Sequence, residues 1–165
     1  MVNSTIDEYF LNSRYWIWNG YKIAWHLKGN TSDQPIILIH GFGACGAHWR
    51  KNINYFAKKG YSVYSIDLLG FGNSDQPGIS QVGALDNGVW CDQVSDFIKE
   101  VIRPHNSKKI ILIGNSLGSL VAITCAVSIA DQISCVIASP LPDQIEFKQK
   151  RFRRKTYLQK IKNKL

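Results

Sequence analysis

The chain has 165 residues, of which 45% are hydrophobic and 12% are aromatic. This length and composition exclude a disordered chain and predict one globular domain with a sizeable core. The formal net charge of +8 lies wholly at the C-terminal end, because residues 1–143 hold 11 basic and 11 acidic side chains, whereas residues 144–165 hold nine basic side chains and Glu146. No apolar run reaches 18 residues, so we expect no membrane-spanning helix.

The predicted elements begin with a β-hairpin. Asn19-Gly20 is a strong signal for a two-residue turn, and it separates two runs rich in aromatic and β-branched residues. A continuous apolar run then predicts a buried strand that ends at a glycine-rich loop, and helical spacing follows until Gly60. The first part of the chain is therefore expected to contain strands over 15–18, 21–27 and 35–39, a helix over 47–59, and a strand over 61–66.

A long loop over residues 67–83 precedes the second part of the chain. Beyond it, apolar spacing predicts a helix over 89–102 that ends before Pro104. The remaining elements are a strand over 109–113, a helix over 116–130 and a strand over 133–138. A hairpin followed by alternating strands and helices predicts an α/β fold with a mostly parallel sheet, an antiparallel edge from the hairpin, and helices on both faces.

The motif Gly114-Asn115-Ser116-Leu117-Gly118 directly follows the predicted strand over 109–113. A strand, a Gly-x-Ser-x-Gly turn and a helix form a nucleophile elbow, which presents a serine hydroxyl at a sharp turn. Gly114 and Gly118 flank the turn where larger side chains would clash. We therefore predict that Ser116 is a nucleophile, with a helix N-cap serine as the alternative.

A serine nucleophile in acyl transfer needs donors for the oxyanion that develops on the attacked carbonyl. The backbone N–H of Leu117 lies at the start of the elbow helix, where the helix dipole favours negative charge. The loop His40-Gly41-Phe42-Gly43 follows the earlier buried strand, and the N–H of Phe42 is the expected second donor.

Three segments carry a family resemblance: HGFGACGAHWR (40–50), IDLLGFGNSD (66–75) and GNSLGS (114–119). Together they resemble the α/β-hydrolase fold over roughly residues 14–143. Within that superfamily they are most similar to pheophytinase and chlorophyll dephytylase, serine carboxylesterases that remove the phytyl tail from chlorophyll pigments. Serine at position 116 argues against epoxide hydrolases and haloalkane dehalogenases, which carry aspartate at the elbow.

The resemblance also implies roles for residues around the nucleophile. His40, Gly41 and Gly43 shape the oxyanion loop, and His40 braces that loop instead of acting as the base. Asp67 is expected to accept hydrogen bonds within the loop that follows the strand over 61–66, although a carboxylate here is also a candidate for chemistry. The structural-loop residues implied by the resemblance are His40, Gly41, Gly43, Asp67, Gly70, Gly72, Ser74, Gly114 and Gly118.

The sequence departs from the family pattern after the nucleophile. An α/β-hydrolase triad follows the chain order Ser, then Asp or Glu, then His. The 49 residues after Ser116 contain no histidine. We therefore expect residues 1–143 to form the N-terminal part of a hydrolase core without its last strands, and residues 144–165 to form a basic tail that begins a lid helix. As this truncated chain, the protein is expected to be weakly active or inactive.

The expected function is hydrolysis of a small-molecule ester, with an apolar alcohol group, without a metal ion or a cofactor. The alternative is a non-catalytic remnant or binding module whose basic tail contacts a membrane surface. Because residues 1–143 carry no net charge, we do not favour binding to nucleic acid. The four cysteines show no CxxC spacing, and we do not expect a disulfide scaffold. A cytoplasmic protein, peripheral to a membrane at most, is therefore expected.

Overall fold

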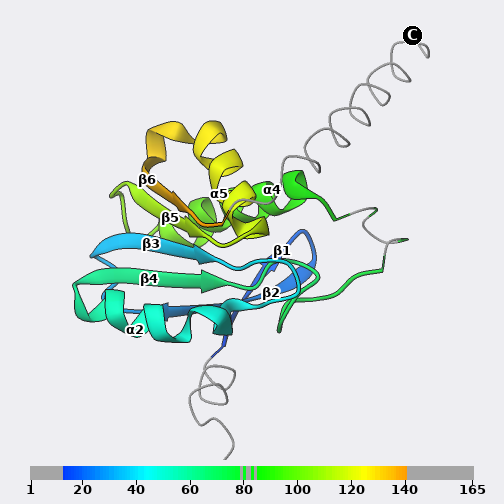
Figure 1. The fold of residues 1–165 in the computed structure, drawn as a ribbon, viewed down its shortest axis with the longest axis horizontal. Coiled ribbons are helices and arrows are strands. Elements are labelled where there is room, and N and C mark those ends of the chain that lie inside the picture. Colours follow the sequence, from blue (N-terminus) through cyan, green and yellow to red (C-terminus); the bar gives the residue numbers. More distant parts are fainter. Residues whose placement is uncertain (1–12, 79, 81–82, 84, 141–165) are drawn as a thin grey trace, which may run out of the picture.

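The computed structural model describes residues 13–78, 80, 83 and 85–140, and it shows one mixed sheet between two layers of helices (Figure 1). Its elements are, in chain order, β1 (Arg14–Trp18), β2 (Tyr21–Lys28), β3 (Gln34–Ile39), the 3₁₀ turn η1 (Gly46–Trp49), α2 (Arg50–Lys58), β4 (Tyr61–Ile66), α4 (Asn87–Phe97), the π-helical turn η2 (Ile98–Ile102), β5 (Ile110–Gly114), α5 (Leu117–Ser128), the 3₁₀ turn η3 (Ala130–Gln132) and β6 (Ile133–Ala138).

The six strands lie in the order β1-β2-β4-β3-β5-β6. The pairs β1–β2 and β2–β4 are antiparallel, whereas β3 pairs in parallel with β4 and β5, and β5 pairs in parallel with β6. Asn19 and Gly20 both have positive φ, of 49° and 84°, as a two-residue hairpin turn requires. The predicted fold class, a mostly parallel sheet with an N-terminal antiparallel hairpin, is confirmed.

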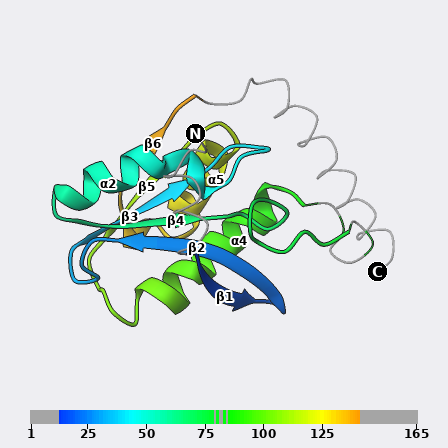
Figure 2. The ribbon, with the colours of Figure 1, turned by 90° about the horizontal axis from the view of Figure 1, so that it is seen from below.

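The helices cover both faces of the sheet, which Figures 1 and 2 show from two directions. Helix α2 packs on one face over the buried side chains of Ile36, Leu38 and Val63. Helices α4 and α5 share the other face, where the larger apolar cluster lies. Strand β3 is consequently buried on both sides, which explains the uninterrupted apolar run that forms it.

Two helices differ from the sequence-based expectation. The segment predicted as a helix over 47–59 begins as the 3₁₀ turn η1, because the N–H of Gly46 is held by Asp67 Oδ1 at 2.6 Å instead of by a local cap. The segment predicted as a helix over 89–102 is α-helical only as far as Phe97. Its last turn is π-helical, and the N–H of Arg103 bonds to the carbonyl oxygen of Ile98 at 2.9 Å.

Strand β6 lies at one edge of the described sheet. Its side chains are mostly half-buried or exposed, and Ile137 is 48% exposed. Among residues 13–140 as far as they are described, no strand pairs with the outer side of β6. The described helices also include none with the length and apolarity that crossing a bilayer demands.

Phe97 of α4 is fully buried in the hydrophobic core. Its ring lies between those of Trp16, Trp25 and Tyr64, with centroid distances of 5.6, 5.4 and 6.0 Å. We expect Phe97→Ala to lower the free energy of unfolding by about 3–5 kcal/mol, because it leaves a cavity among three rings. The matched control is Val127→Ala on α5, where the side chain is 77% exposed and the expected change is within about 0.5 kcal/mol. Urea denaturation measures both, and equal midpoints would contradict the assigned core.

Candidate active site

The turn between β5 and α5 has the backbone geometry of a nucleophile elbow. Ser116 has φ 52° and ψ −114°, and it is one of two non-glycine residues with positive φ among those described. Such a conformation is strained for a residue with a Cβ atom and is characteristic of functional sites. The Ser116 side chain forms no capping hydrogen bond to α5, so the alternative of an ordinary N-cap serine is not supported.

The two glycines of the motif permit direct backbone packing around Ser116. A Cβ atom on Gly114 would lie 2.2 Å from the carbonyl oxygen of Gly118, and one on Gly118 would lie 2.2 Å from the carbonyl oxygen of Ile39. Contacts this short cannot be relieved by moving a side chain, because backbone atoms lie on both sides. The start of α5 therefore packs directly on the end of β3.

The loop after β3 lies against Ser116. A Cβ atom on Gly41 would lie 3.3 Å from the Cβ atom of Ser116. The N–H groups of Phe42 and Leu117 donate no hydrogen bond to any residue in the described part of the chain. Two unpaired backbone donors thus flank a half-buried serine whose hydroxyl is also without a hydrogen-bond partner in that part. The Phe42 side chain is 79% exposed and packs edge-on against Phe71.

The buried His40 ring holds two loops together. Its Nδ1 lies 2.8 Å from the carbonyl oxygen of Gly41, and its Nε2 accepts a hydrogen bond from the N–H of Leu68 at 3.0 Å. Because Nε2 accepts, Nδ1 carries the proton and the ring is neutral. Burial lowers the pKa of His40, which is consistent with this neutral tautomer. Both nitrogens are occupied, so the geometry places His40 as a brace for the loop.

Asp67 is buried and organises the loop after β4. Its two carboxylate oxygens accept the N–H groups of Gly46 and Asn73 at 2.6 and 2.8 Å. Burial raises the pKa of Asp67, and these two bonds partly offset the increase. Gly72 lies so close that a Cβ atom there would be 2.2 Å from Asp67 Oδ2. One carboxylate oxygen thus binds the start of η1, and the other binds within the loop after β4.

The other predicted loop residues also lie here. Ser74 Oγ donates to the carbonyl oxygen of Asp67 at 2.7 Å and accepts the N–H of Ala24 at 2.9 Å, which ties the loop to β2. Gly70 has φ 91°, and a Cβ atom there would lie 2.6 Å from Leu85 Cδ1. Gly43 has φ 70° with open space around it. Glycine is therefore favoured here by the positive φ of the turn, and no neighbouring atom lies close enough to exclude a side chain.

Sequence reasoning missed polar residues that join these parts. Gln93 is buried on α4, where its Oε1 accepts the N–H of Leu69 at 2.9 Å and its Nε2 donates to the carbonyl oxygen of Asp67 at 3.3 Å. Ser119 Oγ donates to the carbonyl oxygen of Gly114 at 2.8 Å and accepts the N–H of Ser139 at 3.0 Å. The available signal was a polar side chain at a position that helical spacing assigns to the apolar face.

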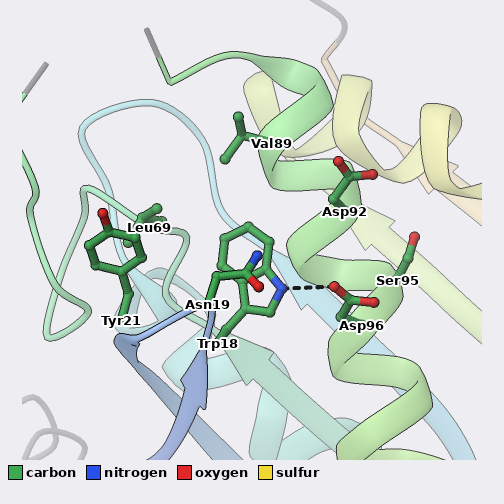
Figure 3. Close-up of a pocket in the computed structure, with 8 residues that line it drawn as sticks. All are labelled: Trp18, Asn19, Tyr21, Leu69, Val89, Asp92, Ser95 and Asp96. Carbon is green, nitrogen blue, oxygen red and sulfur yellow. Dashed lines mark hydrogen bonds between the residues drawn. The ribbon is translucent and has the colours of Figure 1, made fainter. Parts of the chain in front are cut away.

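A cavity of about 600 Å³ lies apart from the elbow, between the β1–β2 hairpin and α4 (Figure 3). Its floor includes Trp18, whose Nε1 donates to Asp96 Oδ2 at 2.8 Å. None of Ser116, Phe42 and Leu117 lines it. Ser95 lines it beside Asp92 and Asp96, and the Ser95 hydroxyl donates to Cys125 Sγ at 3.9 Å. The lining residues are Trp18, Asn19, Tyr21, Leu69, Val89, Asp92, Ser95 and Asp96.

The structure thus brings Ser116, Phe42 and Leu117 together at one end of β3 and β5, with His40 and Asp67 bracing the loops beside them. The described residues contain no group of three or more His, Cys, Asp or Glu side chains able to hold a metal ion. The predicted basic tail, residues 144–165, lies outside the described residues.

Comparisons with known proteins point to one family. A family model described as alpha/beta hydrolase fold matches residues 34–160. The chain is 30% identical over 115 residues to a pimeloyl-[acyl-carrier protein] methyl ester esterase of Aliivibrio fischeri, and 29% identical over 124 residues to epoxide hydrolase 4 of Mus musculus. These matches cover 70% and 75% of this chain but 38% and 33% of the relatives. The chain therefore spans about a third of the length of these curated relatives.

Solved structures show the same fold. The thioesterase domain from the curacin biosynthetic pathway superposes with a TM-score of 0.71 at 23% identity, over 79% of this chain and 44% of that one. A bacterial membrane phospholipase A superposes with a TM-score of 0.70 at 23% identity, over 82% of this chain and 43% of that one.

The elbow geometry generates a prediction for Gly118, the second residue of α5. We expect Gly118→Ala to lower the free energy of unfolding by at least about 2 kcal/mol, because the new methyl group would overlap the carbonyl oxygen of Ile39. Gly88 is the second residue of α4 and offers a matched control, since Gly88→Ala meets only the Asp86 side chain, at 3.1 Å. That variant should stay within about 1 kcal/mol of the unsubstituted chain. Guanidinium denaturation measures both; similar losses in the two variants would contradict the close packing.

Proposed function

The chain belongs to the alpha/beta hydrolase family, and from this premise we propose that it is a serine hydrolase that cleaves carboxylic esters through an acyl-enzyme. The observation that supports this proposal is the strained backbone of Ser116, with φ 52°, at the junction of β5 and α5. Strain of this kind persists only where the surrounding structure imposes it. Here it lifts a hydroxyl out of the sheet, next to two unpaired backbone donors.

In the proposed reaction, Ser116 Oγ attacks the carbonyl carbon of the ester and passes its proton to a base. The N–H groups of Phe42 and Leu117 hold the oxyanion that forms on the carbonyl oxygen. The intermediate collapses, the C–O bond to the alcohol breaks, and the alcohol leaves with a proton. Water then hydrolyses the acyl-enzyme and regenerates Ser116.

The base of this reaction is the missing component. No histidine follows Ser116 in residues 117–165, and both nitrogens of His40 are already hydrogen bonded. We propose that the base is a histidine outside these 165 residues, on a longer polypeptide or on a second chain. By itself, this chain would then turn over esters only slowly, because loss of the base removes most of the rate enhancement.

The proposed substrates are esters with an apolar alcohol group. The serine at position 116 supports ester chemistry over the opening of an epoxide, for which the resemblance implies an aspartate at this place. The name of the matching methyl ester esterase is consistent with the same chemistry. The resemblance to chlorophyll-dephytylating esterases supports a long apolar alcohol.

A fluorophosphonate probe tests the nucleophile. We expect the probe to label Ser116 covalently when added imidazole serves as the base, and Ser116→Ala to abolish the labelling, because an unassisted serine hydroxyl is a poor nucleophile. Ser128→Ala is the matched control on the same helix, since Ser128 is exposed and bonds to the carbonyl oxygen of Thr124. Mass spectrometry of the labelled peptide identifies the site.

The same variants test the missing base. Hydrolysis of a p-nitrophenyl ester should be at least about 10⁴-fold below that of a complete family member. Added imidazole should raise the rate of the chain above that of Ser116→Ala at the same imidazole concentration. If Ser116 is not labelled in the presence of imidazole, and the chain and Ser116→Ala then hydrolyse the ester at equal rates, the enzymatic proposal is wrong.

A second candidate function is a non-catalytic binding module that contacts an anionic membrane through its basic tail. The nine basic side chains in residues 144–165, opposed by Glu146 alone, favour this candidate. Each Lys or Arg near an anionic surface contributes about 1 kcal/mol, so together they suffice for surface binding.

Vesicle flotation tests whether the tail, residues 144–165, binds the membrane. The full chain should float with vesicles that contain phosphatidylserine, and a chain ending at residue 143 should not. Flotation of the full chain should weaken as salt rises, because the attraction is electrostatic. Equal flotation of the two chains would exclude binding through the tail.

A further inference from the structure

Two buried cysteines face each other where α4 packs on α5. Cys91 of α4 and Cys125 of α5 are 5% and 0% exposed. Their Sγ atoms lie 3.4 Å apart, although the residues are 34 positions apart in the sequence. A disulfide bond has an S–S length of about 2.05 Å, so the two sulfurs need to approach by roughly 1.3 Å to form one. The pair is thus close to bonding distance while both thiols are free.

The surroundings give the two sulfurs different chemistry. The Cys125 thiol donates toward Cys91 Sγ, and two serine hydroxyls lie at the pair, Ser95 Oγ at 3.9 Å from Cys125 Sγ and Ser128 Oγ at 4.0 Å from Cys91 Sγ. The hydrogen bond from Cys125 lowers the pKa of Cys91 to about 6, and the same bond together with burial raises the pKa of Cys125. Cys91 therefore has thiolate character, and the thiolate is the nucleophilic form of cysteine.

We propose that Cys91 and Cys125 form a redox-active dithiol that a hydroperoxide oxidises to a disulfide between α4 and α5. The Cys91 thiolate attacks the terminal peroxide oxygen and becomes a sulfenic acid, and the O–O bond breaks to release an alcohol or water. The Cys125 sulfur then attacks the Cys91 sulfur, the S–OH bond breaks, and the hydroxide leaves as water with the Cys125 proton. In balance, two thiols and one hydroperoxide give one disulfide, one alcohol or water, and one water.

The other two cysteines lack this arrangement. Cys45 is half-buried beside the Asp67 loop, and burial raises its pKa, which disfavours the thiolate. Cys135 is exposed on the edge strand β6. Within the part of the chain that the structure describes, neither has a second sulfur within contact distance. The disulfide would also close a loop that contains β5 and Ser116, so oxidation would fix the nucleophile-bearing helix to α4.

The experiment treats the fully reduced full-length chain with one equivalent of hydrogen peroxide. Two of the four thiols should be lost, the mass should fall by two hydrogen atoms, and a non-reducing digest should yield one peptide pair linking Cys91 to Cys125. The Tm should rise by about 5 °C or more relative to the reduced chain, because the cross-link restricts the unfolded state. Dithiothreitol should reverse all four changes.

Paired variants make the test specific. The double variant Cys45→Ser/Cys135→Ser keeps the proposed pair and should lose both of its thiols, whereas Cys91→Ser/Cys125→Ser should retain both of its thiols under the same treatment. Differential alkylation of the unsubstituted chain repeats the mapping without relying on any variant that folds poorly. The proposal is overturned if the bond maps to Cys45 or Cys135, or if Cys91 gains oxygen without forming a disulfide.

Discussion

The rest of this structure depends on the direct contact of two backbones, at the place where the start of α5 meets the end of β3. Only a glycine at position 118 allows the helix to approach the carbonyl oxygen of Ile39 so closely. Ser116, which connects β5 to this closely packed helix, has the strained backbone conformation φ 52°, ψ −114°. The close packing of α5 and the strained turn that carries the Ser116 hydroxyl thus occur at the same junction.

The elements whose origin is local were predictable from the sequence. Each strand falls within about one residue of its predicted range, because hairpin turn residues and apolar runs act over a few positions. The start of η1 and the π-helical end of α4 were not predictable in this way. The first depends on Asp67, 21 residues beyond Gly46, and helical spacing carries no sign of such a distant partner.

The same division applies to the candidate site. The elbow motif consists of five consecutive residues, so the sequence alone predicts Ser116 and its flanking glycines. Gln93 could not, since its contacts with Leu69 and Asp67 span 24 and 26 residues. The buried side chains of His40, Asp67 and Gln93 are hydrogen bonded within the fold, as the cost of burying polar groups requires. They hold the loops in place and leave the serine hydroxyl free.

Strand β6 combines two properties that bear on how long the elbow keeps its shape. It is the outermost described strand on its side of the sheet. The segment just after it is hydrogen bonded to the elbow: the N–H of Ser116 donates to the carbonyl oxygen of Pro140 at 3.0 Å, and Asn115 Nδ2 donates to the carbonyl oxygen of Ser139 at 3.0 Å. Hydrogen bonds at the edge of a sheet open with a lower free energy than those in its interior. Brief opening of this margin would relax the turn while the core stays folded, and early amide hydrogen exchange at Ser116 would reveal it.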